Sequence, residues 1–355
     1  MSSEVLDNEN RDDLEDSLTA LLGDLATVVE KRREIGTRLS SCNRKERAGI
    51  LEEHREVKQI EYALELKVAE LKLSNLLSIG TPKQIDKQKI RVNRLQSRMQ
   101  HGDWLLWTRS IWKFKEMESK ARTGLHPAQF SSVVPNRLIQ MFSFVGDTIL
   151  DPFIGTGTTC IEANKLARHA IGVDINQDFI DLAHNRIHDQ KSDLLFETID
   201  YKSTLHLADA RRIDKISDSS IDLVVTHPPY WNCVQISEIE DDLSNCGNDS
   251  YEYFLLQMKL VIQECFRTLK PDRVAAFMVG DIMRKVDDVT QLFPFHADLI
   301  NLGRQVGFIP WDIYIVETKM RNSGGMPMMG SYPYPHKIFS QFAHNYIIVL
   351  RKPAK

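Results

Sequence analysis

The sequence predicts an α/β protein with a mostly parallel sheet and a separate α-helical extension at its N-terminus. Two observations carry this prediction. In residues 1–76, apolar residues recur at helical spacing, and from about residue 125 short apolar runs alternate with amphipathic helical stretches. We therefore place a helical arm with a basic end at residues 1–100 and a larger α/β domain at residues 101–355.

The overall composition excludes several classes of protein. The chain has 355 residues, of which 42% are hydrophobic and 26% charged, and its net charge is −4. No apolar run reaches the roughly 18 residues of a membrane span, and the acidic N-terminus lacks a signal-peptide pattern. The five cysteines are scattered without CxxC spacing. We expect an intracellular, cytoplasmic protein without a metal site or a membrane partner.

Two apolar stripes predict the structure of the arm. Leu14 to Val28 and Val57 to Leu71 each repeat apolar residues every three or four positions. A break near Ser40 to Asn43 would let the two helices fold into an antiparallel hairpin. Such stripes are typical of a helical hairpin or a dimer seam. The arm could therefore pair two protomers or dock a partner protein.

The chain becomes basic after the arm's second stripe. Residues 83–122 contain eleven Lys or Arg against four acids. Clustered cations followed by aromatic residues suit contact with nucleic-acid phosphates and bases. A solvated helix followed by a packing segment fits the same pattern equally well. The cations on one side of the expected helix are Lys87, Arg91, Arg94 and Arg98, and the aromatic residues are Trp104, Trp107, Trp112 and Phe114.

The remaining chain alternates strand and helix candidates. In such folds, ligands bind at the carboxyl ends of the parallel strands. The last two strand candidates have no helix between them, which predicts a hairpin-like ending. The strand candidates are 147–150, 170–173, 221–225, 274–279, 309–316 and 346–350, and the helix candidates are 159–166, 178–187, 253–269 and 295–306.

A glycine-rich turn indicates a nucleotide-like ligand. A short strand ends at Asp151, and a helix begins near Thr158. Between them, Gly155 and Gly157 permit positive φ and a close approach of a ligand to the backbone. The free N–H groups of the helix N-terminus favour an anionic group. The sequence contains no GxxxxGK[ST] motif, which argues against a P-loop NTPase.

Two acids extend this pattern. Asp174 ends the next strand candidate, where a carboxylate can accept both hydroxyls of a ribose. Asp209 follows at the start of another element, placed to accept from an adenine amino group. Dinucleotide dehydrogenases and methyltransferases share this arrangement of strand, glycine turn, helix, strand and acid.

The segment that separates those two classes is Val225-Thr-His-Pro-Pro-Tyr-Trp-Asn232. The two prolines fix φ and remove two backbone donors, so the carbonyls of His227 and Pro228 are rigidly aimed acceptors for an amino group. Tyr230 and Trp231 offer flat faces on which an extruded base could stack. A proline turn with a packing role is the alternative interpretation.

These motifs resemble those of the DNA amino-methyltransferases, which methylate N4 of cytosine or N6 of adenine. The run from Asp151 to Thr159 resembles their DPFxGxGTT motif, and Thr226 to Trp231 is similar to their [DNS]PP[YFW] motif. The resemblance covers about residues 104–353 and leaves residues 1–76 outside. It implies a Rossmann-like, S-adenosylmethionine-dependent methyltransferase domain that acts on DNA. The segments that also fit are His126 to Phe130, Pro135, Arg137 to Phe142, Phe179 to Ile187 and Gly280-Asp281.

The resemblance also implies roles for individual residues. Asp174 would hold the ribose of S-adenosyl-L-methionine and Asp209 its adenine, while Tyr230 would stack on the flipped base. Hydrogen bonds from both N–H groups make the target nitrogen a better nucleophile, so the chemistry is positioning and polarisation without a catalytic cysteine. The implied cofactor-binding residues are His126, Pro127, Asp151, Phe153, Gly155, Gly157, Thr158, Asp174, Ile175, Asp209, Ala210 and Thr226, and the implied catalytic residues are His227, Pro228, Pro229 and Tyr230.

One position departs from the family pattern. His227 stands where Asp, Asn or Ser is usual, although a neutral imidazole can still accept a hydrogen bond. Thr226 and Trp231 match the TSPPYW form typical of cytosine enzymes, so we favour N4 of cytosine over N6 of adenine. An RNA or protein amino-methyltransferase and a non-enzymatic module remain as alternatives. The recognition sequence and the biological setting, whether restriction, phage or regulation, stay open.

Overall fold

The computed structural model describes residues 2–42, 46–96, 101–114, 131–190, 201–231, 233, 236–239, 241–248, 250–286, 288–318 and 342–354. These residues form two compact units. One contains the described residues up to Gly102, and the other contains most of those from Asp103 onward.

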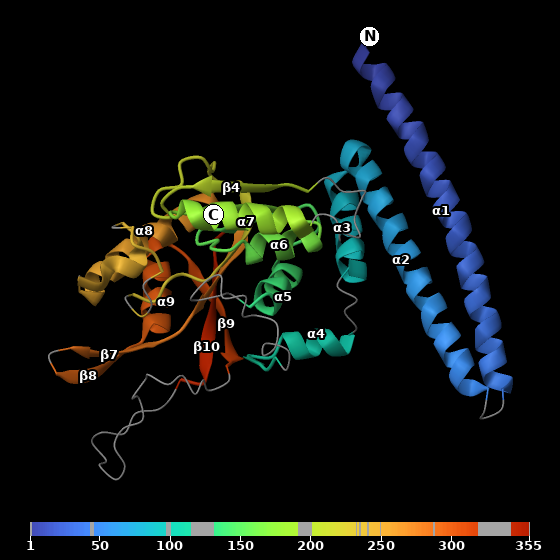
Figure 1. Ribbon diagram of the computed structural model, residues 1–355. Helices are drawn as coiled ribbons and strands as arrows, with labels where there is room; N and C mark the ends of the chain where they lie inside the picture. Colours follow the sequence, from blue (N-terminus) through green and yellow to red (C-terminus); the bar gives the residue numbers. More distant parts are fainter. Residues whose placement is uncertain are drawn as a thin grey trace. The chain divides into compact units, whose positions relative to one another are not determined.

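The first unit is a helical hairpin with a third helix. α1 (Ser2–Ser41) and α2 (Arg47–Ile79) lie side by side (Figure 1), and ion pairs join Arg38 to Glu53 at 3.0 Å and Arg32 to Glu61 at 3.2 Å. The partner on α2 moves from Glu53 to Glu61 as the residue on α1 moves back from Arg38 to Arg32, so the two helices are antiparallel. The hairpin predicted from the two apolar stripes is therefore confirmed, with its break between Ser41 and Arg47.

The third helix, α3 (Pro82–Gln96), packs one face against α2. Val92 is fully buried, and the Gln88 side chain donates to the Ala69 carbonyl at 2.7 Å. Three of the four cations that the sequence places on one side of this helix, Lys87, Arg91 and Arg94, are exposed. The fourth, Arg98, lies outside the described residues.

An eight-stranded sheet forms the centre of the second unit, in the order β1-β9-β10-β6-β5-β2-β3-β4. All its neighbouring strands are parallel except β10, which is antiparallel to both β6 and β9. The strands are β1 (Ile111–Trp112), β2 (Thr148–Asp151), β3 (His169–Asp174), β4 (Ser203–Leu207), β5 (Ile221–Thr226), β6 (Leu269–Val279), β9 (Ile309–Glu317) and β10 (His344–Arg351), and a separate hairpin joins β7 (Ile282–Val286) to β8 (Val289–Phe293).

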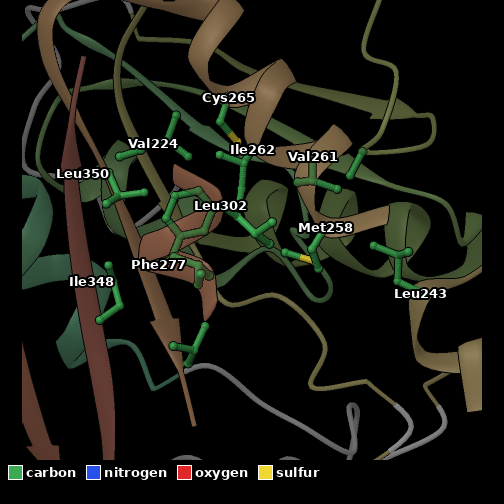
Figure 2. Packing of buried hydrophobic residues seen from close by; sticks show 14 of the residues in the cluster. Val224, Leu243, Met258, Val261, Ile262, Cys265, Phe277, Leu302, Ile348 and Leu350 are labelled. Carbon is green, nitrogen blue, oxygen red and sulfur yellow. The ribbon is translucent and has the colours of Figure 1, made fainter. Parts of the chain in front are cut away.

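Helices cover both faces of this sheet. Alternate strand residues point to opposite faces, so Leu150 and Val224 pack with α8 and α9, whereas Ile149 and Leu223 pack with α5, α6 and α7. Figure 2 shows the first of these clusters, in which Phe277 lies among residues of α8 and β10. The helices are α4 (His101–Trp107), α5 (Val133–Phe142), α6 (Thr158–Lys165), α7 (Gln177–Gln190), α8 (Tyr251–Thr268) and α9 (Phe295–Val306), and a 3₁₀ helix spans Leu243–Asn248.

The α/β fold predicted from the sequence is confirmed, including the hairpin-like ending formed by β9 and β10. The six predicted strands are present, although β6 begins at Leu269 rather than Val274. Strands β1, β4, β7 and β8 were not predicted. None of the described helices is both long and apolar enough to cross a membrane.

Candidate active site

The carboxyl ends of the parallel strands meet at one edge of the sheet, where a cleft opens. It encloses about 550 Å³, counting its open mouth. The turns after β2, β3, β4 and β5 contribute to its walls, as expected for a fold of this kind. The residues that line it are Pro152, Phe153, Gly155, Asp174, Ile175, Asp209, Ala210, His227, Pro229, Ile236, Asp241, Asp242 and Leu243.

Asp151, the last residue of β2, lies behind this wall. Its buried carboxylate accepts hydrogen bonds from the hydroxyls of Thr159 and Thr226, both at 2.6 Å, and from the Phe153 N–H at 3.0 Å. Burial raises the pKa of Asp151 to about 6, against these three hydrogen bonds, which lower it. Asp151 thus ties the glycine turn to the start of α6 and the end of β5.

The two glycines of the turn have different tasks. Gly155 (φ +49°) lines the cleft, where a ligand can approach its backbone. Gly157 (φ +86°) does not line the cleft, and a Cβ there would lie 3.0 Å from Ala183 Cβ. Gly157 therefore allows α6 to begin close against α7.

Asp174 ends β3 and faces the cleft. Its carboxylate accepts from the backbone N–H groups of Gly155 and Asn176, both at 2.9 Å. Burial, with a smaller contribution from the negative charges of Asp242 and Asp151, raises the pKa of Asp174 to about 6, although its two backbone hydrogen bonds lower it. One carboxylate therefore both fixes the glycine turn and presents charge to the cleft.

Asp209 lies in the turn after β4 rather than at the start of another element, where we expected it. Its carboxylate accepts from the Arg211 backbone N–H at 2.8 Å and from the Arg211 guanidinium. It lines the cleft next to Ala210.

The opposite wall comes from residues that the sequence motifs did not indicate. Ile236, Asp241, Asp242 and Leu243 follow the catalytic motif and line the cleft. The acidic run from Glu238 to Asp242 was the available signal. Asp174, Asp209, Asp241 and Asp242 together give the cleft four carboxylates, which favour a ligand that carries positive charge.

The catalytic motif begins at the end of β5, whose six residues are all buried. Nε2 of His227 lies 2.7 Å from the Tyr230 hydroxyl, which also forms a hydrogen bond with the Gly280 backbone. Burial raises the pKa of Tyr230 above its usual range, so the hydroxyl stays protonated. His227 and Pro229 line the cleft, whereas Pro228 does not, although both prolines are buried.

Trp231 does not offer a face to a base. A positive φ of +45° turns its ring into the core, where it contacts Tyr251 and Phe293. The stacking role that we inferred for Trp231 from its place in the motif is therefore wrong, because the turn geometry makes it a packing residue.

The other predicted site residues divide into two groups. Phe153, Ile175 and Ala210, which the resemblance implies as cofactor-binding residues, line the cleft. Thr158 and Thr226 are buried behind it with Asp151. His126 and Pro127 lie outside the described residues.

This sheet and its glycine turn form a Rossmann-like α/β fold with an acidic cleft at the carboxyl ends of its strands. A family model described as DNA methylase, for N6 and N4 enzymes, matches residues 40–185 and 221–355. The chain belongs to this DNA methylase family, which confirms the resemblance. The match begins within α1, so our placement of residues 1–76 outside the family resemblance is wrong for residues 40–76.

Curated relatives and solved structures match parts of the chain. The type II methyltransferase M.MjaI of Methanocaldococcus jannaschii is 38% identical over 41% of this chain and 54% of its own length. M.ScaI of Streptomyces caespitosus is 39% identical over 22% of this chain and 27% of its own length. The chain thus spans about half or less of these relatives.

Among solved structures, TTHA0409 of Thermus thermophilus, complexed with S-adenosyl-L-methionine, is 28% identical. That match covers 42% of this chain and 54% of the other, with a TM-score of 0.32. A methyltransferase of Methanosarcina mazei is 16% identical over 61% of this chain and 98% of its own, with a TM-score of 0.42.

Proposed function

We propose that this protein transfers a methyl group from S-adenosyl-L-methionine to an exocyclic amino nitrogen of a flipped DNA base, N4 of cytosine. N6 of adenine is the alternative target. One observation carries the proposal: the cofactor-motif residues Phe153 and Gly155 and the catalytic-motif residues His227 and Pro229 line the same cleft. A donor held by the first pair would meet an acceptor held by the second.

The cleft fits the proposed cofactor in charge and in hydrogen-bonding groups. When bound, S-adenosyl-L-methionine supplies a methyl group on a positively charged sulfur. The four carboxylates of the cleft would attract that charge, and Asp174 keeps lone pairs for ribose hydroxyls beside its two backbone bonds. Asp209 would accept from adenine while Arg211 holds its carboxylate in place.

The catalytic motif would hold and polarise the target amine. Its prolines leave the carbonyls of His227 and Pro228 without competition from neighbouring backbone donors. The Tyr230 ring is fixed at its hydroxyl by His227 and Gly280, which sets the plane on which a base would stack. Thr226 and Trp231 match the TSPPYW form of the motif that is typical of cytosine enzymes, and this match favours cytosine as the target.

The test is transfer of tritium from methyl-labelled cofactor into DNA, with RNA and protein as parallel arms. We expect label in DNA, recovered as N4-methylcytosine after digestion to nucleosides. Tyr230→Ala serves as the matched inactive control. Tyr230 is proposed to hold the base, and it is not among the residues that line the cleft beside the cofactor motif, so cofactor binding should be retained. Label in N6-methyladenine would correct the base, and label only in RNA or protein would refute the proposal.

We also propose that the arm pairs two protomers. The stripe residues Val57 and Val68 are buried within the hairpin, but Leu22, Leu51 and Ile60 are 41, 39 and 52% exposed. Pairing with a second copy of the arm would remove their apolar surface from water. Replacing all three with Lys in the full chain should lower the mass measured by light scattering from dimer to monomer. An unchanged mass would refute the pairing, and Lys substitutions at exposed polar positions of α1 provide the control.

A further inference from the structure

The wall of the cleft that follows the catalytic motif is built by hydrogen bonds within one short segment. The described residues of 236–245 are here called the wall segment. In it, the Asp242 carboxylate accepts from the Ser237 hydroxyl at 2.5 Å and from the Ser244 N–H at 2.7 Å. These bonds give the segment its own shape, but they do not fix where it stands relative to the other walls of the cleft.

The Arg211 side chain joins the wall segment to two other elements. Its guanidinium donates to the Asp209 carboxylate in the turn after β4 at 2.8 Å, to the Asp241 carbonyl in the wall segment at 2.9 Å, and to the Gln257 side chain on α8 at 2.8 Å. The Arg211 side chain is 15% exposed. Because a guanidinium holds its donors in a rigid planar fork, one arginine can fix the relative positions of three acceptors.

This bridge spans the cleft from behind. Asp209 and Asp241 line the cleft, whereas Arg211 is not among the lining residues. Leu243 gives the wall segment a second, apolar attachment, since it is 4% exposed and belongs to the same buried cluster as Met258 of α8 (Figure 2). The polar attachment through Arg211 is the one that reaches the turn after β4, and it therefore sets the separation of two cleft walls.

We propose that Arg211 is a positioning residue for the cofactor, which holds the wall segment against the turn after β4 at the width that the adenosine part of S-adenosyl-L-methionine requires. This inference rests on the proposed function, which assigns the adenine to Asp209. It goes beyond the support of the Asp209 carboxylate, because the bond to the Asp241 carbonyl holds the other wall. Walls that already stand at the right separation lower the cost of ordering the site on binding.

Charge alone predicts the opposite effect of Arg211. This cation offsets two of the four carboxylates of the cleft, Asp209 and, with an N···O distance of 3.8 Å, Asp241. Removing it would make the cleft more negative and strengthen the binding of a positively charged ligand. Loss of the bridge would instead weaken that binding. The sign of the change in affinity therefore separates positioning from electrostatics.

The test measures the affinity of S-adenosyl-L-methionine by calorimetry for the full chain and for Arg211→Gln and Arg211→Lys. Arg267→Gln is the matched control, because Arg267 also ties α8 to the connection between β4 and β5. It donates to the carbonyls of Ile216 at 2.9 Å and Ile213 at 3.2 Å, and none of these three residues lines the cleft. Melting temperature and single-turnover methyl transfer to DNA at saturating cofactor are measured on every variant.

We expect Arg211→Gln to lower cofactor affinity about tenfold or more, with the transfer rate at saturating cofactor within about twofold of the parent. Arg211→Lys retains the charge but not the planar fork, so it should lose most of the same affinity. Arg267→Gln should bind the cofactor like the parent, even where its melting temperature falls as far as that of Arg211→Gln.

An Asp209→Ala background isolates the wall segment. No carboxylate remains there for Arg211 to support at position 209, so a further loss of about tenfold on Arg211→Gln would come from the bond to the Asp241 carbonyl. No further loss in that background would overturn the inference, because Arg211 would then act through Asp209 alone.

Three other results would also overturn it. They are unchanged or higher affinity in Arg211→Gln, parent-like affinity in Arg211→Lys, and an equal loss of affinity in Arg267→Gln. A parent chain that binds no S-adenosyl-L-methionine would instead refute the proposed function on which the inference rests.

Discussion

In the half of the cleft that follows β2, β3 and β4, each turn is closed by a hydrogen bond between near neighbours, and the bonds of Asp174 to Gly155 and of Asp151 to Thr226 join these turns to more distant segments. In the half that follows β5, the bond of His227 to Tyr230 is local, and contacts with distant segments hold the remaining side chains. In the first, here called the cofactor half, Asp151, Asp174 and Asp209 each accept from the backbone N–H two residues further on. This is one local turn used three times. In the second, the target half, Tyr230 bonds Gly280 and Asp281 bonds His296.

The difference shows how the two halves depend on the rest of the fold. A turn closed by its own aspartate forms wherever the strand before it ends. The target half needs β6, α9 and β10 to be packed correctly before its side chains meet. Substitutions in the two halves should therefore give separable effects, one on cofactor affinity and the other on the rate of transfer.

The largest effect is expected at His227. Its replacement by Ala removes a polar group from the cleft and leaves the Tyr230 hydroxyl without that partner. We expect single-turnover methyl transfer to fall on the order of 10²-fold, as for other positioned polar groups. Cofactor affinity should stay within about twofold of the parent, because the cofactor half is built locally.

Tyr230→Phe separates the two roles of His227. It removes the same hydrogen bond but retains the imidazole and the aromatic ring. If the phenylalanine variant is as slow as His227→Ala, the histidine acts by fixing the Tyr230 ring. If it is fast, His227 contacts the target directly. If the His227→Ala variant is as fast as the parent, the backbone carbonyls of the motif alone polarise the target amino group.

The strands and turns of the cofactor half could be predicted from the sequence because each turn is closed by residues close together in the chain. The strands β2 and β3 are mostly apolar and largely buried, and the polar residues that end them belong to one local motif each. Strand β4 was missed because its residues are half-exposed and mixed. The β7–β8 hairpin was missed because its two short strands place adjacent polar residues between apolar ones, without a regular alternation.

The target half could be predicted only where its residues are adjacent in the sequence. The Pro-Pro-Tyr motif identified His227 and Tyr230, but nothing in the motif shows that Trp231 turns inward at a positive φ. Asp281 and His296 are 15 residues apart in sequence, and their pairing depends on how α9 packs against the sheet. No spacing rule connects them.

A smaller effect is expected at Asp174 in the cofactor half. Asp174→Ala removes the proposed ribose acceptor and frees the Gly155 N–H. The loss of about 1.5–3 kcal/mol should lower cofactor affinity tenfold to a hundredfold in calorimetry. At saturating cofactor the transfer rate should recover most of its parent value. Asp174→Asn, which keeps one acceptor oxygen, should lie between the two, and unchanged affinity in both variants would place the carboxylate outside the binding site.

The pH dependence of cofactor affinity should come from the same carboxylate. Burial raises the pKa of Asp174 to about 6. A protonated carboxyl accepts less well and no longer attracts a cation, so affinity should be constant above pH 7 and fall as the pH drops below 6. One proton gives a slope of up to about tenfold per pH unit. Asp174→Asn should show a flatter profile, and an identical slope in that variant would assign the titration to another group.

The smallest effect is expected on α3, which belongs to neither half. Lys87, Arg91 and Arg94 are exposed on the helix that packs Val92 against α2. If these cations contact DNA phosphates, replacing all three with Gln should reduce the salt dependence of DNA binding by up to about 0.9 log–log units per lost contact. Cofactor affinity and the single-turnover rate at saturating DNA should not change, because the cleft is untouched.

The matched control neutralises three exposed cations of the hairpin, Lys31, Lys58 and Lys67, which removes the same charge from the same unit. Fluorescence anisotropy titrations at several salt concentrations measure both slopes. Equal slopes in the two triple variants would show that α3 presents a solvated face and that net charge alone sets the salt response, whereas a smaller slope only in the α3 variant would make this helix part of the DNA-binding surface.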